Sequence, residues 1–262
     1  MPANSLRITL IQPFLHWENK AANLSAMETK LAPLAGKTDL VILPEMFTTG
    51  FSMNTSVLAE DTEGPTLAWM RSMASALNAV ITGSFIAKEA GKYFNRLIWM
   101  QPSGGYLTYD KRHLFTLAGE QDYYQAGDSI PNFDLLGWKV RPLICYDLRF
   151  PVWSRNTDHY DLLIYVANFP ARRQHAWKSL LVARAIENQA YTIGVNRVGE
   201  DGKKIYYSGD SQLIDYDGQV LFHCADDEAV YTHSISYEAQ QSYRQKFAFL
   251  ADQDRFSIIS TI

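Results

Sequence analysis

The hydrophobic and polar positions along the chain follow two alternating patterns. Short apolar runs rich in β-branched residues predict strands at 6–12, 39–43, 79–87, 93–101, 106–109, 133–136, 140–144, 162–166, 191–196, 211–216, 219–223 and 230–236. Apolar residues spaced three and four apart predict helices from about Asn19 to Gly36, from Pro65 to about Leu77, and at 152–156 and 174–189. Several strands are continuously apolar, which indicates burial on both faces.

The order of these elements predicts the fold class. Strand–helix alternation is mixed with hairpin signals such as Asp217-Gly218, which indicates a mixed sheet, or two packed sheets, with helices outside. No repeat, linker or break in composition divides the chain. We therefore expect an α/β protein whose residues 1–262 form one domain.

Composition excludes several classes of protein. The chain has 262 residues, of which 47% are hydrophobic and 20% charged, an ordinary globular composition. Its formal charge is 24 − 28 = −4 without a basic block, which disfavours partners such as nucleic acid or anionic membranes. Neither a secretory signal nor an apolar run of membrane-spanning length is present, and two cysteines make no disulfide framework. The expected location is the reducing cytoplasm.

Cys145 is the first candidate for chemistry. It ends a buried strand within the stretch Pro-Leu-Ile-Cys-Tyr-Asp-Leu-Arg-Phe-Pro. A thiol at a strand-to-helix turn can lie near helix N–H groups, which lower its pKa. The alternative is a small buried apolar residue. Cys224, at the end of a predicted hairpin, is interpreted as structural.

Glu45 and Lys111 are the next candidates. Glu45 follows Leu-Pro at the mouth of a buried strand, where it could act as a general base. Lys111 follows the strand 106–109, where its ammonium could stabilise an oxyanion. Taken singly, each is better explained as a surface or capping charge, and only their combination with Cys145 favours catalysis.

Together, the three motifs resemble the signatures of the nitrilase (carbon–nitrogen hydrolase) superfamily. They are Leu-Pro-Glu at 43–45, Tyr-Asp-Lys-Arg-His-Leu-Phe at 109–115, and Ile-Cys-Tyr-Asp-Leu-Arg-Phe-Pro at 144–151. The resemblance runs from about Leu6 to about Ser236 and includes the helix residues 183–189. The motif after Cys145 and the stretch 168–177 are similar to the ω-amidase branch, also called nitrilase-like protein two. The segment 114–128 is shorter than in longer members of the family.

The resemblance implies a fold, an assembly and an active site. The fold is a four-layer α-β-β-α sandwich with two mixed sheets, and the expected assembly is a homodimer. Its expected contact elements are the segments 152–156 and 174–189, with the alternative that the apolar faces of these segments simply pack on the sheet. Glu45 is the general base and Cys145 the nucleophile. Lys111 and the backbone N–H of Tyr146 hold the oxyanion. Glu120 resembles the second glutamate of the family, which orients Lys111 or the substrate amide, although a plain loop carboxylate is its alternative.

The implied substrate is a 2-oxo acid monoamide such as 2-oxoglutaramate or 2-oxosuccinamate. Arg172 and Arg173 are candidates for its carboxylate, because a guanidinium suits two-point contacts with that group. Tyr146 and Phe169 are expected to line the pocket, whereas Arg149 is expected in a structural ion pair. An N-carbamoyl compound, another amide or a nitrile remains an alternative substrate, and a non-catalytic binding protein is an alternative of a different class.

No metal or cofactor is expected. The six histidines are scattered, and none forms a metal-binding pair of the His-Glu-x-x-His type. His113 is expected to be a loop histidine without a partner, and the alternative is that it supports the Lys111 loop. Replacing Lys111 by Met is expected to abolish activity with little loss of stability.

Overall fold

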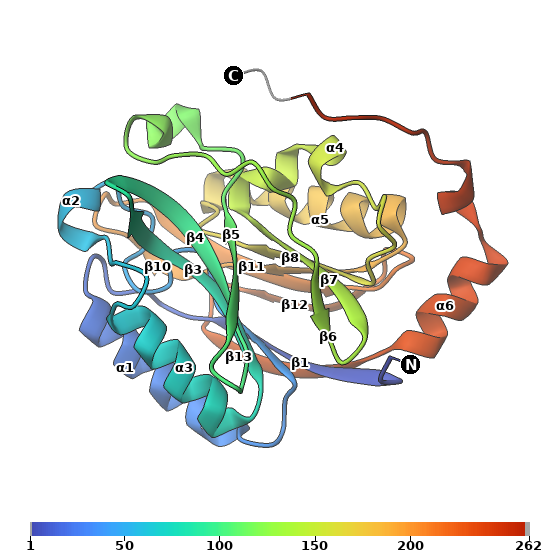
Figure 1. Cartoon of the computed structure of the whole chain (residues 1–262), viewed down its shortest axis with the longest axis horizontal. Coiled ribbons are helices and arrows are strands. Elements are labelled where there is room, and N and C mark those ends of the chain that lie inside the picture. The colour runs from blue at the N-terminus through green and yellow to red at the C-terminus, as the bar shows by residue number, and fades with distance from the viewer. Residues whose placement is uncertain (1, 260–262) are drawn as a thin grey trace.

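Two mixed β-sheets stack on each other between outer helices in the computed structural model, which describes residues 2–259 (Figure 1). The first sheet has the order β13-β1-β2-β3-β4-β5, in which β1, β2 and β3 are parallel and the other neighbours antiparallel. Its strands are β1 (Ser5–Gln12), β2 (Leu40–Ile42), β3 (Val80–Glu89), β4 (Lys92–Met100), β5 (Tyr106–Asp110) and β13 (Ala229–Ser236).

The second sheet has the order β10-β11-β9-β8-β7-β6, with β12 also paired to β11. Here β7, β8 and β9 are parallel, and the remaining pairs are antiparallel. Its strands are β6 (Phe133–Leu135), β7 (Trp138–Ile144), β8 (Leu162–Val166), β9 (Tyr191–Val195), β10 (Val198–Glu200), β11 (Tyr206–Ile214) and β12 (Val220–Ala225).

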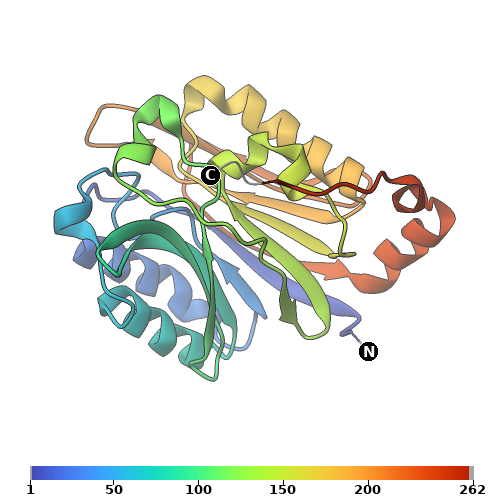
Figure 2. The same ribbon diagram turned by 45° about the horizontal axis from the view of Figure 1, so that its top comes forward.

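Helices cover the outer face of each sheet, which gives four layers (Figure 2). On the first sheet, α1 (Lys20–Leu31) and α3 (Pro65–Leu77) bury their apolar stripes, with α2 (Thr55–Leu58) nearby. On the second, α5 (Gln174–Asn188) packs Trp177 and Leu181 onto the strands, and α4 (Pro151–Ser154) follows β7. The largest apolar core lies between the sheets, where Trp99 and Trp138 are fully buried.

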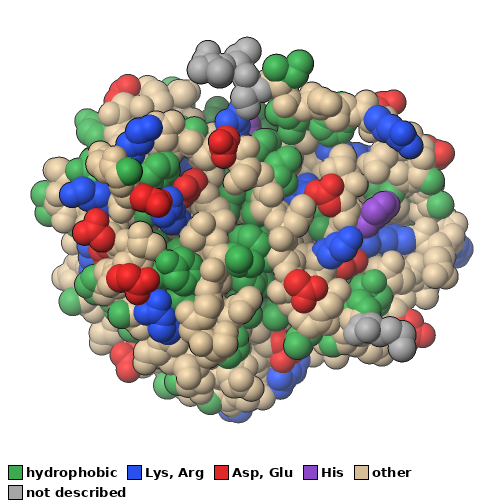
Figure 3. Space-filling model, viewed as in Figure 1, with side chains coloured by type: hydrophobic (Ala, Val, Ile, Leu, Met, Phe, Trp, Pro, Cys, Tyr) green, Lys and Arg blue, Asp and Glu red, His purple; other side chains and the backbone are tan. Residues whose placement is uncertain are grey.

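The predicted α/β class with two mixed sheets is confirmed, and so are most of the predicted elements. Sequence reasoning missed α2, β10 and α6 (Tyr237–Lys246). α6 was missed because its residues are polar and only Gln240 is buried. This helix lies at the edge of the molecule, beyond the ends of the sheets (Figure 1). On the face shown in Figure 3, acidic and basic side chains are interspersed, as the small net charge leads one to expect.

Candidate active site

The three predicted residues follow strands from both sheets and meet at one cavity. Glu45 lies just beyond β2, Lys111 directly after β5 and Cys145 directly after β7. β2 and β7 are parallel strands of their sheets, and the loops at the carboxyl ends of such strands commonly form ligand sites. All three residues line a cavity of about 260 Å³. The stacking of the two sheets therefore brings together residues that lie up to a hundred positions apart in the chain.

Lys111 lies between the carboxylates of Glu45 and Glu120, and these three fully buried side chains form a group that we call the buried ion box. Lys111 Nζ donates to Glu45 Oε1 at 2.9 Å and to both Glu120 oxygens at 3.1 and 3.0 Å, and all three side chains are 0% exposed. Burial alone would lower the pKa of Lys111, but the charges of Glu120 and Glu45 outweigh it and raise the pKa above its ordinary value. Lys111 is thus a permanent cation. Its removal would strand two buried carboxylates, so the structure leads us to expect that Lys111→Met loses stability as well as activity, contrary to the expectation from the sequence.

Glu120 completes the box from the short segment after β5. It begins a 3-10 turn, Glu120–Asp122, and its Oε2 accepts the N–H of Phe115 at 2.5 Å. Burial raises the pKa of Glu120, Lys111 opposes the shift, and the charge of Glu45 adds to it. The structure thus places Glu120 in the same buried group as Lys111 despite the shortened segment.

Two asparagines, which sequence reasoning missed, hold this box in place. Asn95 on β4 donates to Glu45 Oε1 at 2.8 Å and to Glu120 Oε1 at 3.3 Å. Asn168, which follows β8, donates its backbone N–H to Glu45 Oε2 at 2.8 Å. Each carboxylate is therefore fixed from several sides. Asn95 carries no local signal, because its partners come from other strands.

Cys145 occupies a sharp turn at the end of β7. Its φ is +44°, a left-handed conformation that non-glycine residues rarely adopt, and it begins the 3-10 segment Cys145–Arg149. Burial raises the pKa of the Cys145 thiol well above its ordinary value, the charge of Glu45 raises it further, and Lys111 opposes the shift. The expected lowering of the thiol pKa by helix N–H groups is wrong, since the segment is a short 3-10 turn and burial dominates. A neutral thiol needs a base to become a nucleophile.

One buried carboxylate joins the Lys111 loop to the Cys145 turn. Asp147 accepts the N–H of Ile144 and the hydroxyl of Tyr109 at 3.0 and 2.7 Å, and the N–H and Nδ1 of His113 at 3.0 and 2.8 Å. Tyr109 and His113 stand two residues before and after Lys111, while Ile144 immediately precedes Cys145. Asp147 therefore fixes the spacing of ammonium and thiol.

The expectation that His113 lacks a partner is wrong. Besides the contact with Asp147, its ring stacks on Phe150 with centroids 3.6 Å apart. The signal that could have revealed this pair is the Asp two residues after the Cys, but nothing in the sequence shows that the two loops meet.

Four cations line the outer part of the cavity: Arg149, Arg172, Arg173 and Lys203. Within residues 2–259, none of them forms a salt bridge with a carboxylate. Arg173 stacks over the rings of Phe115 and Phe169, at 4.9 and 5.6 Å from their centroids. Burial lowers the pKa of Arg173, and the neighbouring charges of Arg172 and Arg149 lower it further.

Arg172 and Arg173 line the cavity, where the hypothesis of a carboxylate contact needs them, but the structure differs from the expectation for Arg149. The ion pair expected for Arg149 is not formed among the described residues, and its guanidinium instead lies over Phe169 at 5.8 Å. Lys203 was missed, because a lysine in a polar turn carries no distinguishing signal.

Aromatic side chains form the apolar wall. Phe169 is 4% exposed and packs on Trp177, and Tyr146 contacts Phe115 and Phe150 edge to face at 5.0 and 5.1 Å. Both predicted aromatic residues line the cavity. A small, flat substrate would contact these aromatic rings with its apolar carbon surface.

No group of three or more His, Cys, Asp or Glu side chains suited to a metal ion occurs among residues 2–259. Within the same range no helix has both the length and the apolar character to cross a membrane. Cys224 and Cys145 are both free thiols.

Comparison with known proteins places these features in a family context. The family model described as carbon-nitrogen hydrolase matches residues 7–245. The omega-amidase YafV of Escherichia coli is 43% identical over 256 residues, which cover 97% of this chain and 98% of that protein. The 2-oxoglutaramate amidase of Bacillus subtilis is 30% identical over 250 residues, or 94% of this chain and 96% of the relative.

A solved structure is similar over almost the whole chain. It is a CN-hydrolase superfamily protein from Xanthomonas campestris with an arsenic adduct in its active site. Its TM-score is 0.95 at 44% identity, over 98% of this chain and 100% of that one.

Proposed function

The chain belongs to the carbon–nitrogen hydrolase family, and we propose that it is an ω-amidase that converts small 2-oxo acid monoamides to 2-oxo dicarboxylates and ammonia. Substrates of this class are 2-oxoglutaramate and 2-oxosuccinamate. Similarity to omega-amidases and 2-oxoglutaramate amidases over nearly the full length supports the activity. The observation that carries it is the ammonium of Lys111, held between two buried carboxylates at the cavity that the thiol of Cys145 also lines.

The first chemical step forms a thioester. Glu45 takes the proton of the Cys145 thiol, and the sulfur attacks the amide carbon. The ammonium of Lys111 and the backbone N–H of Tyr146 stabilise the oxyanion that develops on the former carbonyl oxygen. A donor of this kind typically contributes about 10²–10³ in kcat. The carbon–nitrogen bond then breaks, and the proton held by Glu45 leaves with the nitrogen as ammonia.

The second step returns the enzyme to its starting state. Glu45 takes a proton from a water molecule, whose oxygen attacks the thioester carbon. The carbon–sulfur bond breaks and the proton held by Glu45 returns to sulfur. The product is released as a carboxylic acid, which loses its remaining proton to water and becomes the 2-oxo dicarboxylate. Glu120 serves as a positioning residue, because it accepts hydrogen bonds from the ammonium of Lys111 at 3.0 and 3.1 Å.

Arg173 is the proposed partner of the carboxylate that does not react. It is partly buried, stacked between two aromatic rings and free of any salt bridge to the described carboxylates. Stacking presets the guanidinium and reduces the entropy lost on binding. Arg172, exposed at the rim, would supplement it.

The test is ammonia release by wild type and Cys145→Ala from 2-oxoglutaramate, 2-oxosuccinamate, an N-carbamoyl amino acid and a simple nitrile. Turnover of the two oxo acid amides that depends on Cys145 supports the proposal. Preference for another substrate would reassign specificity and keep the triad, and activity in the alanine variant would refute the mechanism.

We further propose a cytoplasmic homodimer. A reducing compartment keeps Cys145 as the thiol that the mechanism requires. Val152 on α4 and Ile186 on α5 are 54% and 53% exposed, and the two segments are joined by the hydrogen bond from Asn156 N to Asn188 Oδ1. A second copy would cover these apolar side chains. Light scattering should give a dimer for wild type and a smaller species for Ile186→Glu, and a wild-type monomer would refute the assembly.

A further inference from the structure

The cavity is divided by charge into two halves. Its inner end holds the Glu45 and Lys111 pair beside Cys145. Its outer wall is formed by Arg149, Arg172, Arg173 and Lys203, so all of its charged side chains are positive. Glu45 is the only carboxylate among the described residues that line the cavity. Unpaired like charges repel one another and do not stabilise the folded state. A cluster of four cations therefore indicates that this wall binds an anionic group.

Lys203 reaches this wall from a turn that is built firmly. The turn joins β10 to β11, and Asp201 Oδ1 accepts the N–H groups of Lys203 and Ile205 at 2.8 and 3.0 Å. Asp201 Oδ2 accepts the hydroxyl of Tyr207 at 3.0 Å. Both carboxylate oxygens of Asp201 therefore accept hydrogen bonds within this turn. Its contact with Lys203 is to the backbone N–H and not to the side-chain ammonium.

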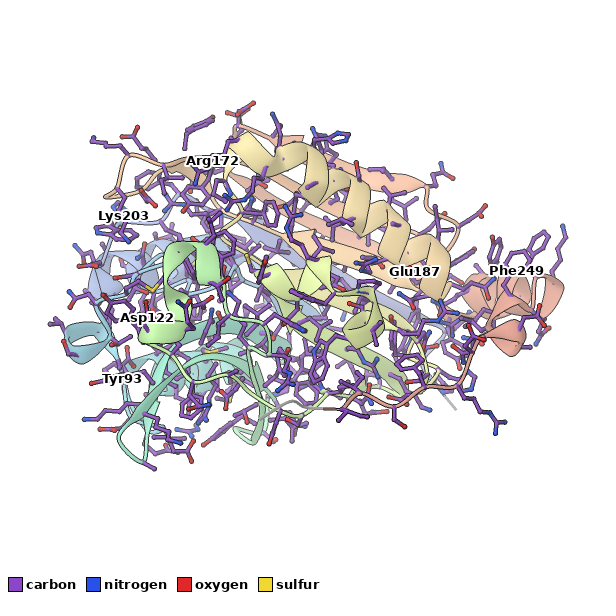
Figure 4. All side chains as sticks on the ribbon, turned by 90° about the horizontal axis from the view of Figure 1, so that it is seen from above. Tyr93, Asp122, Arg172, Glu187, Lys203 and Phe249 are labelled. Carbon is purple, nitrogen blue, oxygen red and sulfur yellow. The ribbon has the colours of Figure 1, made fainter. Side chains whose placement is uncertain are left out.

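The other charges of the turn neutralise each other. Glu200 pairs with Lys204 at 3.1 Å, and the side chain of Lys204 is 82% exposed and does not line the cavity. Among the described residues, Lys203 thus carries the unpaired charge of the turn. In Figure 4, Lys203 and Arg172 lie at the same end of the molecule although they come from different segments.

The positive charges of this wall would distinguish between two related kinds of substrate. A 2-oxo acid amide carries one negative charge beside an uncharged carbonyl. The corresponding 2-amino acid amide, glutamine, carries an ammonium at that carbon. In the outer half of the cavity this ammonium would lie among cations without any carboxylate to pair with. Like-charge juxtaposition of this kind is a common device of specificity.

We propose that Lys203 is a specificity-determining residue, which together with Arg173 admits the carboxylate of a 2-oxo acid amide and excludes the ammonium of a 2-amino acid amide. The inference rests on the proposed amidase function and assigns its selectivity to a residue outside the Glu-Lys-Cys group. Charge reversal at Lys203 should therefore weaken binding of the oxo acid and provide the ammonium with a partner.

The experiment compares kcat/KM for 2-oxoglutaramate and glutamine in wild type, Lys203→Glu and Lys204→Glu. The two variants change net charge equally, at neighbouring positions, but only the first lies at the cavity. We expect the preference for the oxo acid amide to fall on the order of tenfold in Lys203→Glu, because reversal acts in opposite directions on the two substrates. In Lys204→Glu it should stay within about twofold.

Binding is measured separately from turnover, as protection of Cys145 from iodoacetamide by each amide. Peptide mass spectrometry distinguishes Cys145 from Cys224. Stronger protection by 2-oxoglutaramate than by glutamine, reduced only in Lys203→Glu, supports the proposal. Equal protection by both amides in wild type, or equal effects of the two variants, overturns it. Selective protection without ammonia release would instead refute the amidase function and leave the role of Lys203 standing.

Discussion

Lys111→Met tests the buried box directly. Methionine has nearly the length of lysine but carries no charge, so it removes the cation without opening a large cavity. Three donations to Glu45 and Glu120 disappear, and both carboxylates remain buried with 0% exposure. Asn95 still donates to each, but an amide does not neutralise a charge.

The expected cost in stability is large. Removing one partner of a buried ion pair typically costs about 3–5 kcal/mol, since it leaves an uncompensated charge. For a chain of this size, each kcal/mol lowers Tm by about 2–4 °C. Turnover should fall by at least about 10²–10³, because the oxyanion donor is lost.

The deficit should depend on pH in a defined direction. Burial already raises the pKa of Glu120 in the wild type, where Lys111 opposes the shift. Without that opposition the pKa of Glu120 rises further, and the folded state keeps a proton that the unfolded state releases. Stability from such a group is complete below the unfolded pKa and is lost as pH rises through the folded pKa. The variant should therefore be closer to wild type at about pH 5 than at about pH 8.

Urea unfolding followed by tryptophan fluorescence at both pH values measures the effect. Lys204→Met is the matched control, because its side chain is 82% exposed, and it should change stability by no more than about 0.5 kcal/mol. If Lys111→Met unfolds at the same urea concentration as wild type at both pH values, the buried ion box does not exist as described.

Other changes test the remaining parts of the site. Asp147→Asn loses acceptors for the two loops and should lower kcat by about 10²-fold with little change in KM, and unchanged kcat in steady-state assays would refute the positioning role. Glu45→Gln removes a charge that raises the pKa of Cys145, so alkylation by iodoacetamide should shift to lower pH while amide turnover is lost, and an unshifted alkylation profile would contradict this. Arg173→Met should raise KM about tenfold or more for 2-oxoglutaramate but little for an uncharged amide, and equal effects on both substrates would exclude a carboxylate contact.

Sequence by itself determined most of the elements, and it identified the three residues that the fold brings to one cavity. The apolar runs at 162–166 and 191–196 and the helical spacing at 174–189 are local patterns, and they correspond to β8, β9 and α5 with bounds shifted by a residue at most. Glu45, Lys111 and Cys145 lie in short motifs next to strands. Periodicity and short motifs depend only on residues that are close together in the chain, so they can be recognised without knowledge of the tertiary structure.

Only the tertiary structure decided which groups hold those residues in place and which protonation states they favour. Asn95 and Lys203 lack a local signal, and the motif that contains Asp147 does not show which groups this carboxylate binds, because those groups come from other strands and loops. The pKa of Cys145 depends on burial and on the distance to Glu45 and Lys111, so helix position alone gave the wrong sign. Electrostatic energy depends on separation and burial in three dimensions, and the packing of two sheets is what determines both.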